Sequence, residues 1–355
     1  MTNLYWPVYK NIEKEIVELS NHIHFDDTQV CVYSVKISEL LIRCAVEIEA
    51  IAKDLYKQNG GKYYTDTENG RKRDYLLNLD DNGQELPDAP KNRRDLFFDT
   101  DCIAYLENIW SLSKKKVLVS ASNFYFNLPE HKILTPLKKA NKRGTSSSDW
   151  LKAYQAVKHN RSEDLKEGNI KHLLRAAAGL FLLNLYYKDD IFELSNSNKN
   201  NFSEKYSEIF DIKVHTWHSG SIDSYFKKED FEECVYFTKW TNDYKNKLTK
   251  WITEQNKNLN ELIFNHPNVL QHLNDNFIEN GKIKMEELKS FWKNREYFKC
   301  FDMQKEYGRM LQSADYSASE KTKFNLKQTP AQYEAVLNKN QEIYPQEPNL
   351  TDDLV

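Results

Sequence analysis

The segment 169–187 constrains the fold of this chain most strongly, because it is apolar on nearly every side of a helix. Within its apolar run, Leu173–Tyr187, only Arg175 and Asn184 are strongly polar. A helix without a polar face has to be surrounded by other elements. The run is too short to span a bilayer, so it predicts the central helix of a bundle and no membrane segment.

A second helix is predicted over residues 27–57, where apolar side chains recur at three- and four-residue steps. Asp26, Asp27 and Thr28 offer N-capping side chains at its start, and Gly60 and Gly61 end it. The periodic positions are Val30, Tyr33, Ile37, Leu41, Cys44, Ile48, Ile51 and Leu55. The segment therefore predicts a long amphipathic partner for the apolar helix.

The remaining chain predicts further helices and a little β-structure. Residues 65–95 are polar and rich in Gly, Asp and Asn, which indicates a long loop or a partly ordered insertion. Helices are also expected around 99–112, from 149 onward, at 240–265 and at 283–312, and strands at 116–126 and 209–217. We therefore expect a mainly α protein with an N-terminal helical domain (1–194) carrying a small β insertion. A polar linker (195–202), a mainly helical C-terminal domain (203–345) and a frayed tail (346–355) follow.

The composition of the chain indicates a helical globular protein with reduced cysteines. The formal charge is −3, and ten Gly and nine Pro among 355 residues are few, which favours a helical globular chain. The five cysteines form no Cys-x-x-Cys pair, which indicates reduced thiols and a cytoplasmic protein. The N-terminal residues show no basic region followed by an apolar one, so no secretory signal is expected. We expect no metal site and no cofactor.

The segment 138–161 is the clearest candidate binding site. It holds seven Lys or Arg residues and one acid, Asp149, in a chain of nearly balanced charge. Such a local excess of positive charge is typical of a site for phosphate groups. The predicted phosphate or nucleic-acid ligands are Lys138, Lys139, Lys142, Arg143 and Lys158.

His159 lies among these cations and is the side chain there that can transfer protons near neutral pH. The pattern predicts His159 as the proton-transfer group, with Lys158 and Arg161 holding a phosphate. The alternative is a basic helix end that only complements the helix dipole.

Arg43 and Glu47 are the other candidate catalytic residues. With Glu39 they stand four residues apart on one face of the predicted 27–57 helix, and Arg43 has apolar sequence neighbours. A charge in apolar surroundings is costly unless it is paired, and this often marks a site. The alternative is a solvated ladder of ion pairs along the helix.

The helix 37–56 and the segment 150–185 together resemble the HEPN superfamily. More narrowly, Tyr5–Lys14 and the spacing Trp150, Tyr154, Lys158-His159-Asn160-Arg161 resemble uncharacterised bacterial proteins with a Trp-x3-Tyr-x3-Lys-His-x-Arg segment. The resemblance covers about residues 1–190. It implies an HEPN-like helical bundle, a homodimer, and a role in bacterial antiphage or toxin systems.

Active members of this superfamily are metal-independent ribonucleases that use an Arg followed four to six residues later by a His. This chain lacks that spacing, because His159 precedes Arg161 and His172 lies too far beyond it. The resemblance therefore implies an RNA-directed protein that is either a ribonuclease or a non-catalytic nucleic-acid- or nucleotide-binding module. A third possibility is a module that assembles with a partner protein of a defence operon.

Overall fold

The computed structural model describes residues 3–68, 71–194, 205–215, 228–279, 282–312 and 330–341. The chain divides into two compact units, one formed by Met1–Lys239 with Glu334–Val355 and the other by Trp240–Tyr333. Both units are mainly helical, as the sequence predicts. In the part of the chain described, no helix has the length and apolar character needed to cross a membrane.

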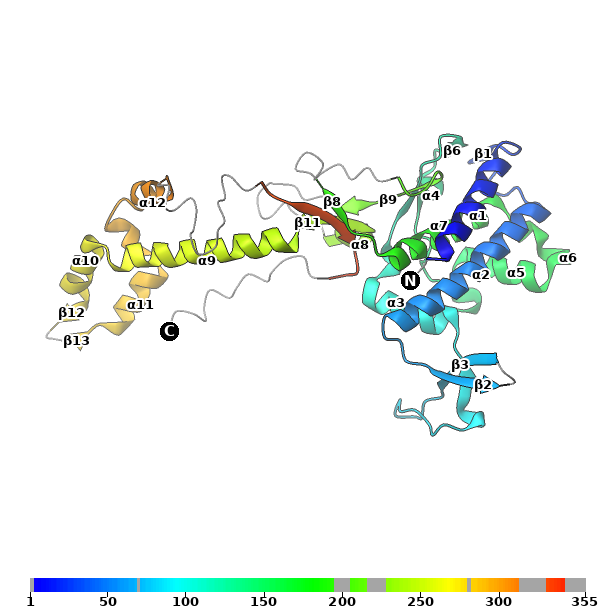
Figure 1. Cartoon of the computed structure of the whole chain (residues 1–355), viewed down its shortest axis with the longest axis horizontal. Coiled ribbons are helices and arrows are strands. Elements are labelled where there is room, and N and C mark those ends of the chain that lie inside the picture. Colours follow the sequence, from blue (N-terminus) through cyan, green and yellow to red (C-terminus); the bar gives the residue numbers. More distant parts are fainter. Residues whose placement is uncertain are drawn as a thin grey trace. The chain divides into compact units, whose positions relative to one another are not determined.

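Four helices form the core of the first unit: α1 (Tyr5–Ser20), α2 (Val35–Gln58), α5 (Asp149–His159) and α7 (Ile170–Lys188). Helices α2 and α7 pack along each other, and α1 and α5 each contact both of them. Shorter helical segments complete the unit (Figure 1). They include a π-helical stretch at Phe98–Ile103, α3 (Ala104–Trp110), α4 (Pro129–Lys132), α6 (Arg161–Asp164) and α8 (Lys228–Glu233).

Helix α7 is the central helix that its composition predicts. Its side chains are buried around most of its circumference, and Leu180 and Leu183 have no exposed surface. Asn169 caps its N-terminus by accepting a hydrogen bond from the His172 backbone at 3.0 Å. The buried Asn184 is accommodated because its amide donates to the Leu180 carbonyl at 3.0 Å.

Helix α2 begins later than the sequence pattern indicates. Its N-cap is Ser34, which accepts a hydrogen bond from the Ile37 backbone at 3.2 Å. Asp26 and Asp27 therefore do not cap it. Asp26 closes a local turn by accepting from the backbone of Thr28 and Gln29, and Asp27 contacts a different part of the chain. Side-chain periodicity alone did not distinguish this turn from the helix.

Residues 64–68, 71–77 and 93–95 form a three-stranded antiparallel sheet in the region where the sequence indicates a long loop or a partly ordered insertion. The strands are β2 (Tyr64–Glu68), β3 (Arg71–Leu77) and β4 (Arg93–Asp95), and the sheet lies beyond the C-terminal end of α2 (Figure 1). Its polar strands are joined by ion pairs, because Arg93 contacts both Asp66 and Asp88 at 2.5 and 2.7 Å. Stacking of Tyr64 on Tyr75 adds an aromatic cross-strand contact.

Strands late in the chain complete the first unit. The sheet β7-β5-β9 joins Ile133–Leu134, Val117–Val119 and Phe210–Ile212, and a second sheet has the order β10-β11-β14-β8. The second sheet contains Val214–His215, Tyr236–Trp240, Tyr333–Leu337 and Phe192–Leu194. A short parallel pair, β1 (Phe25–Asp26) with β6 (Phe124–Tyr125), lies at one end of the bundle.

The first compact unit extends past the boundary predicted at 195–202, because much of the chain that follows this run belongs to it. The run 195–202 itself lies outside the described residues. A buried carboxylate attaches the later segment to α1: Glu13 is 1% exposed and accepts hydrogen bonds from the Tyr9 hydroxyl, the Ser207 hydroxyl and the Glu208 backbone. Contacts between residues this far apart in the sequence are not visible in local patterns.

The second unit contains α9 (Asn242–Phe264), α10 (Pro267–Phe277), α11 (Met285–Lys293) and α12 (Met303–Gln312). Its small core is built on Ile263, Val269 and Phe301. A two-stranded hairpin, β12 (Ile278–Glu279) with β13 (Lys282–Ile283), follows α10. The predicted helix 283–312 is divided by a turn and a 3₁₀ segment, and the predicted tail 346–355 lies outside the described residues.

Candidate nucleic-acid interface

The first half of the basic segment is a turn region anchored by buried neighbours. The indole Nε1 of Trp150 donates to the Pro136 carbonyl at 2.7 Å, and Leu137 and Ala140 are buried. Because these anchors face the core, Lys138 and Lys139 between them are exposed. The local sequence thus places the two lysines on the surface.

Four of the predicted phosphate ligands remain available to an anion. Lys138, Lys139, Lys142 and Lys158 are exposed, and none forms an ion pair with any described residue. The ammonium group of Lys158 lies 5.2 Å from the ring centroid of Tyr154, which leaves its charge uncompensated. These four residues are called the lysine set below.

Arg143 differs from the lysine set. Its Nε lies 2.9 and 2.7 Å from the two carboxylate oxygens of the buried Asp99, and its guanidinium lies 3.5 Å from the Phe97 ring centroid. Its charge is therefore compensated, and its predicted role as a phosphate ligand is replaced by a structural ion pair. The partner precedes it by 44 residues, so local charge counting missed it.

The single acid of the basic segment is also engaged elsewhere. Asp149, the first residue of α5, forms an ion pair with Arg175 of α7. It therefore does not neutralise the lysine set, and the positive excess predicted for this segment is reduced only at Arg143.

His159 and Arg161 are exposed at the junction of α5 and α6. Asn160 separates the two helices and donates to Glu163 and Asp164 of α6. Among the described residues, neither the His159 ring nor the Arg161 guanidinium has a hydrogen bond or an ion pair. No carboxylate therefore fixes the tautomer of His159, and its catalytic role stays a prediction.

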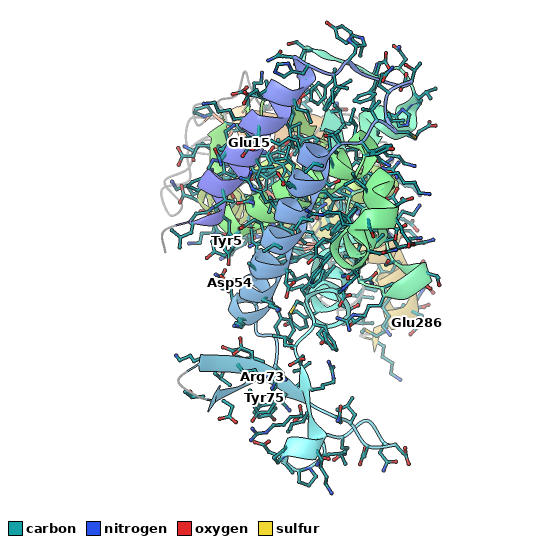
Figure 2. All side chains as sticks on the ribbon, turned by 90° about the vertical axis from the view of Figure 1, so that its right-hand side faces the viewer. Tyr5, Glu15, Asp54, Arg73, Tyr75 and Glu286 are labelled. Atoms are coloured by element: carbon teal, nitrogen blue, oxygen red, sulfur yellow. The ribbon has the colours of Figure 1, made fainter. Side chains whose placement is uncertain are left out.

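Arg43 and Glu47 do not join His159. Arg43 donates to Glu15 of α1 at 2.5 Å, and Lys36 shares the same carboxylate. The hydrogen bond from Lys36 holds the pKa of Glu15 below its usual value, against the effect of burial, and Arg43 adds to this. Figures 1 and 2 show α1, with the labelled Glu15, and the α5–α6 region on opposite sides of α2.

Glu47 remains a partly buried carboxyl on α2. Burial raises its pKa, and the charge of Arg43 only partly offsets that effect. Arg43 thus forms a bridge from α2 to α1 instead of a ladder along one helix. The catalytic set of four residues predicted from the sequence is not assembled in the structure.

A histidine that the sequence interpretation missed does have a fixed carboxylate partner. Nδ1 of His131 in α4 lies 2.7 Å from Oδ1 of Asp27, which follows β1. The two residues are 104 positions apart, and Asp27 was interpreted as a helix cap. Only the pairing of β1 with β6 brings their segments together, and no spacing rule could have found this pair.

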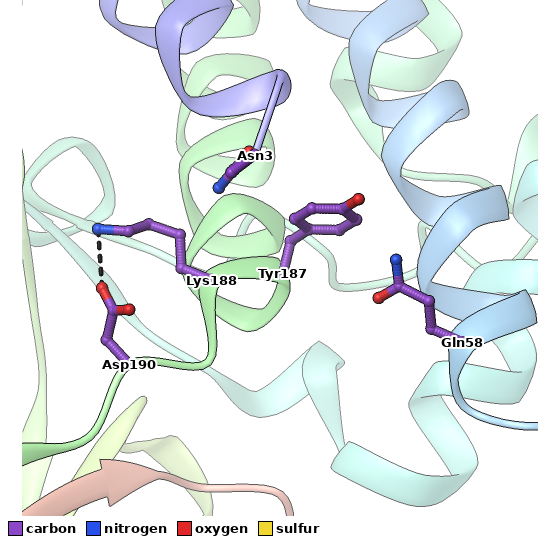
Figure 3. A pocket seen from close by; sticks show the side chains of 5 residues that line it. All are labelled: Asn3, Gln58, Tyr187, Lys188 and Asp190. Carbon is purple, nitrogen blue, oxygen red and sulfur yellow. Dashed lines mark ion pairs between the residues drawn. The ribbon is translucent and has the colours of Figure 1, made fainter. Parts of the chain in front are cut away.

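A polar pocket of about 470 Å³ lies at the other end of the bundle, between the start of α1 and the ends of α2 and α7. Asn3, Gln58, Tyr187, Lys188 and Asp190 line it, and Lys188 pairs with Asp190 at 2.8 Å (Figure 3). The side-chain nitrogen of Asn3 is buried without a hydrogen-bond partner among the described residues. No residue of the lysine set lines this pocket.

Comparison with known proteins returned no relative: no family model, no curated protein and no solved structure matches this chain. Within the described residues, no three His, Cys, Asp or Glu side chains gather as metal ligands do.

Proposed function

We propose that this protein binds RNA, or a polyanion with the same phosphate chemistry, through the lysine set. The observation that supports the proposal is that the segment 138–158 exposes the lysine set, together with Lys152, without an ion-pair partner among the described residues. The chain as a whole has a formal charge of −3, so its average charge does not explain affinity for a polyanion. Local positive charge does, because displaced counterions favour binding.

The HEPN resemblance supports a narrower form of the proposal, a metal-independent ribonuclease of a bacterial antiphage or toxin system acting as a homodimer. In this form His159 transfers protons and Arg161 holds the scissile phosphate. If so, His159→Ala abolishes cleavage while RNA binding, which depends on the lysine set, is kept.

One observation favours a second function, a non-catalytic RNA-binding module. His159 lacks an orienting partner among the described residues, and Arg43 is engaged by Glu15. Binding of RNA without cleavage requires neither an oriented His159 nor an unpaired Arg43. Such a module acts by holding RNA for a partner protein.

The test of binding is a charge-neutralised variant in which Lys138, Lys139, Lys142 and Lys158 are all replaced by Gln. We expect weaker binding to a single-stranded RNA. The salt dependence of log K should be flatter by about 0.7 for each phosphate that the variant no longer neutralises. Filter binding at several salt concentrations measures this slope.

The matched control carries four Lys→Gln changes at exposed lysines that are also without ion pairs in the described part of the chain. Its sites are Lys14, Lys72, Lys91 and Lys250. Both variants change the net charge equally, so only the location of the charge differs. Equal slopes for the two variants contradict the proposal, because binding then follows net charge alone.

A further inference from the structure

Asp27 and His131 form a mostly buried acid–histidine pair at the end of the bundle where β1 pairs with β6. Their side chains are 18% and 12% exposed. The Asp27 carboxylate also accepts hydrogen bonds from the backbone nitrogens of Asn127 and Leu128 at 2.7 and 3.2 Å. Burial raises the pKa of Asp27, but the hydrogen bond from His131 and those from the backbone outweigh it and hold this pKa below its usual value.

The pair fixes the tautomer of His131. An ionised carboxylate only accepts hydrogen bonds, so the Nδ1 atom of His131 carries the proton and Nε2 of the neutral ring carries the lone pair. The ring also packs edge-on against Phe126, with centroids 5.7 Å apart. Among the described residues Nε2 has no hydrogen-bond partner, and it does not belong to the buried unpaired atoms. It therefore keeps some solvent-accessible surface.

Asp27 gives His131 the orienting carboxylate that His159 lacks among the described residues. A carboxylate that orients an imidazole and stabilises its protonated form is the way in which histidine bases are prepared for proton transfer. Attaching the 25–28 segment to α4 requires only the Asp27 carboxylate and the two backbone N–H groups. The free Nε2 atom is the additional feature that such an attachment does not need.

We propose that His131, and not His159, is the proton-transfer residue for cleavage of bound RNA and that Asp27 is its positioning residue; this rests on the RNA-directed function proposed above. Nε2 takes the proton of a ribose 2′-hydroxyl, and the 2′-oxygen forms a bond to the adjacent phosphorus. The bond from phosphorus to the 5′-oxygen breaks, and this oxygen receives a proton from the imidazolium. The products are a 2′,3′-cyclic phosphate and a 5′-hydroxyl end, with no metal or co-reactant consumed.

The lysine set begins close to this site. Lys138 follows His131 by seven residues, which include the two-residue strand β7 and the turn anchored by Trp150. Even a fully extended chain of that length spans only about 25 Å. Lys138 therefore lies within a distance of His131 that a few nucleotides of an extended RNA strand can span.

Other charged groups lie near Asp27 and His131 and contribute to the electrostatic potential at the pair. Glu130 and Lys132 lie on α4 itself, and Glu130 interacts electrostatically with Arg175 of α7. From the β1 side come Asp26 and the exposed His24, whose Nε2 lies 3.7 Å from the Asp26 carboxylate. The strands β5 and β7, which contact α4, are apolar.

The decisive variant is His131→Asn in the full-length chain. The side-chain nitrogen of Asn replaces Nδ1 as the donor to Asp27, while the base at Nε2 is lost. Cleavage of a 5′-labelled RNA in EDTA is expected to fall by about 10²–10⁴-fold. The affinity for RNA and the melting temperature are expected to stay unchanged. The matched control is His22→Asn, a change at an exposed histidine outside the pair, which retains full cleavage.

Asp27→Asn tests the positioning role. It keeps an acceptor for the backbone N–H groups but removes the charge that stabilises the imidazolium. We expect kcat for cleavage to fall while the affinity for RNA stays unchanged, a split that a purely structural role does not produce. An RNA with a 2′-O-methyl group at the cleaved position resists cleavage but still binds, and it shifts the His131 Nε2 resonance of the wild-type protein in NMR spectra.

Three outcomes overturn the inference. They are a His131→Asn variant as active as wild type, a His131 resonance that the bound 2′-O-methyl RNA leaves unmoved, and a wild-type protein that binds RNA without cleaving it. The last outcome leaves RNA binding by the lysine set intact. Absence of RNA binding by wild type instead overturns the proposed function itself.

Discussion

Lys115 provides a quantitative test of the energetics of the first unit. Its side chain has no exposed surface, and its Nζ donates to the Glu232 carbonyl at 3.0 Å. Burial lowers the pKa of Lys115 to about 8 from 10.5, against the opposing effect of Cys234 and nearby carboxylates. At pH 7 the protein therefore folds with a mostly charged ammonium group in its interior.

The lowered pKa of Lys115 determines in which direction the stability of the protein changes with pH. Between pH 8 and 10.5 the unfolded chain binds more protons at this position than the folded chain, so the free energy of unfolding rises with pH. A shift from 10.5 to about 8 corresponds to roughly 3 kcal/mol between the ionised and the neutral side chain. Integrated from pH 7 to pH 10, the contribution of Lys115 to stability rises by roughly 2–3 kcal/mol.

Lys115→Met keeps most of the stem volume and removes the charge. We expect the variant to be more stable than wild type at pH 7, by about 1–2 kcal/mol after the missing hydrogen bond is allowed for. The advantage should shrink as the pH rises, because the wild-type protein loses its buried charge. Urea unfolding of both proteins at several pH values between 7 and 10 measures this difference in the free energy of unfolding.

The matched control is Lys114→Met. Lys114 is half exposed and pairs with Glu232 at 2.5 Å, a surface contact worth at most about 1 kcal/mol. A difference between wild type and Lys115→Met that does not change with pH refutes the reasoning, because the folded and unfolded chains then bind protons equally at Lys115 and burial does not lower its pKa.

Three further variants test individual contacts. Arg143→Gln should leave the salt dependence of RNA binding nearly unchanged, because Asp99 already compensates this charge, whereas Lys142→Gln should flatten it; equal slopes for the two contradict the structural assignment. Asn169→Ala should lower the free energy of unfolding by about 1 kcal/mol through loss of the α7 N-cap, measured by urea unfolding, and an unchanged midpoint argues against that cap. Gly168→Ala should destabilise by about 1–3 kcal/mol, since its Cβ would overlap the Ser38 hydroxyl; thermal melting that matches wild type shows that Ser38 can move aside.

Local patterns in the sequence determined the main helices. The apolar surface of 169–187 predicted the buried α7 because a helix without a polar face can be stable only when it is surrounded. The spacing of apolar residues likewise predicted α2, α5 and α9, although α2 begins at Val35 and not at residue 27. Exposure of Lys138 and Lys139 also follows from the sequence, because charged side chains between buried apolar residues stay in water.

Only the tertiary structure decided which charges are free and which histidine is oriented. Asp99 neutralises Arg143, Glu15 holds Arg43, and Asp27 orients His131, in each case across 28 residues or more. It also decided that residues 205–239 and 334–341 complete the first unit, through strands whose partners lie far away in the chain. The physical reason is the same in every case. Hydrophobic periodicity is a property of one segment, whereas ion pairs and strand partners depend on how separate segments meet.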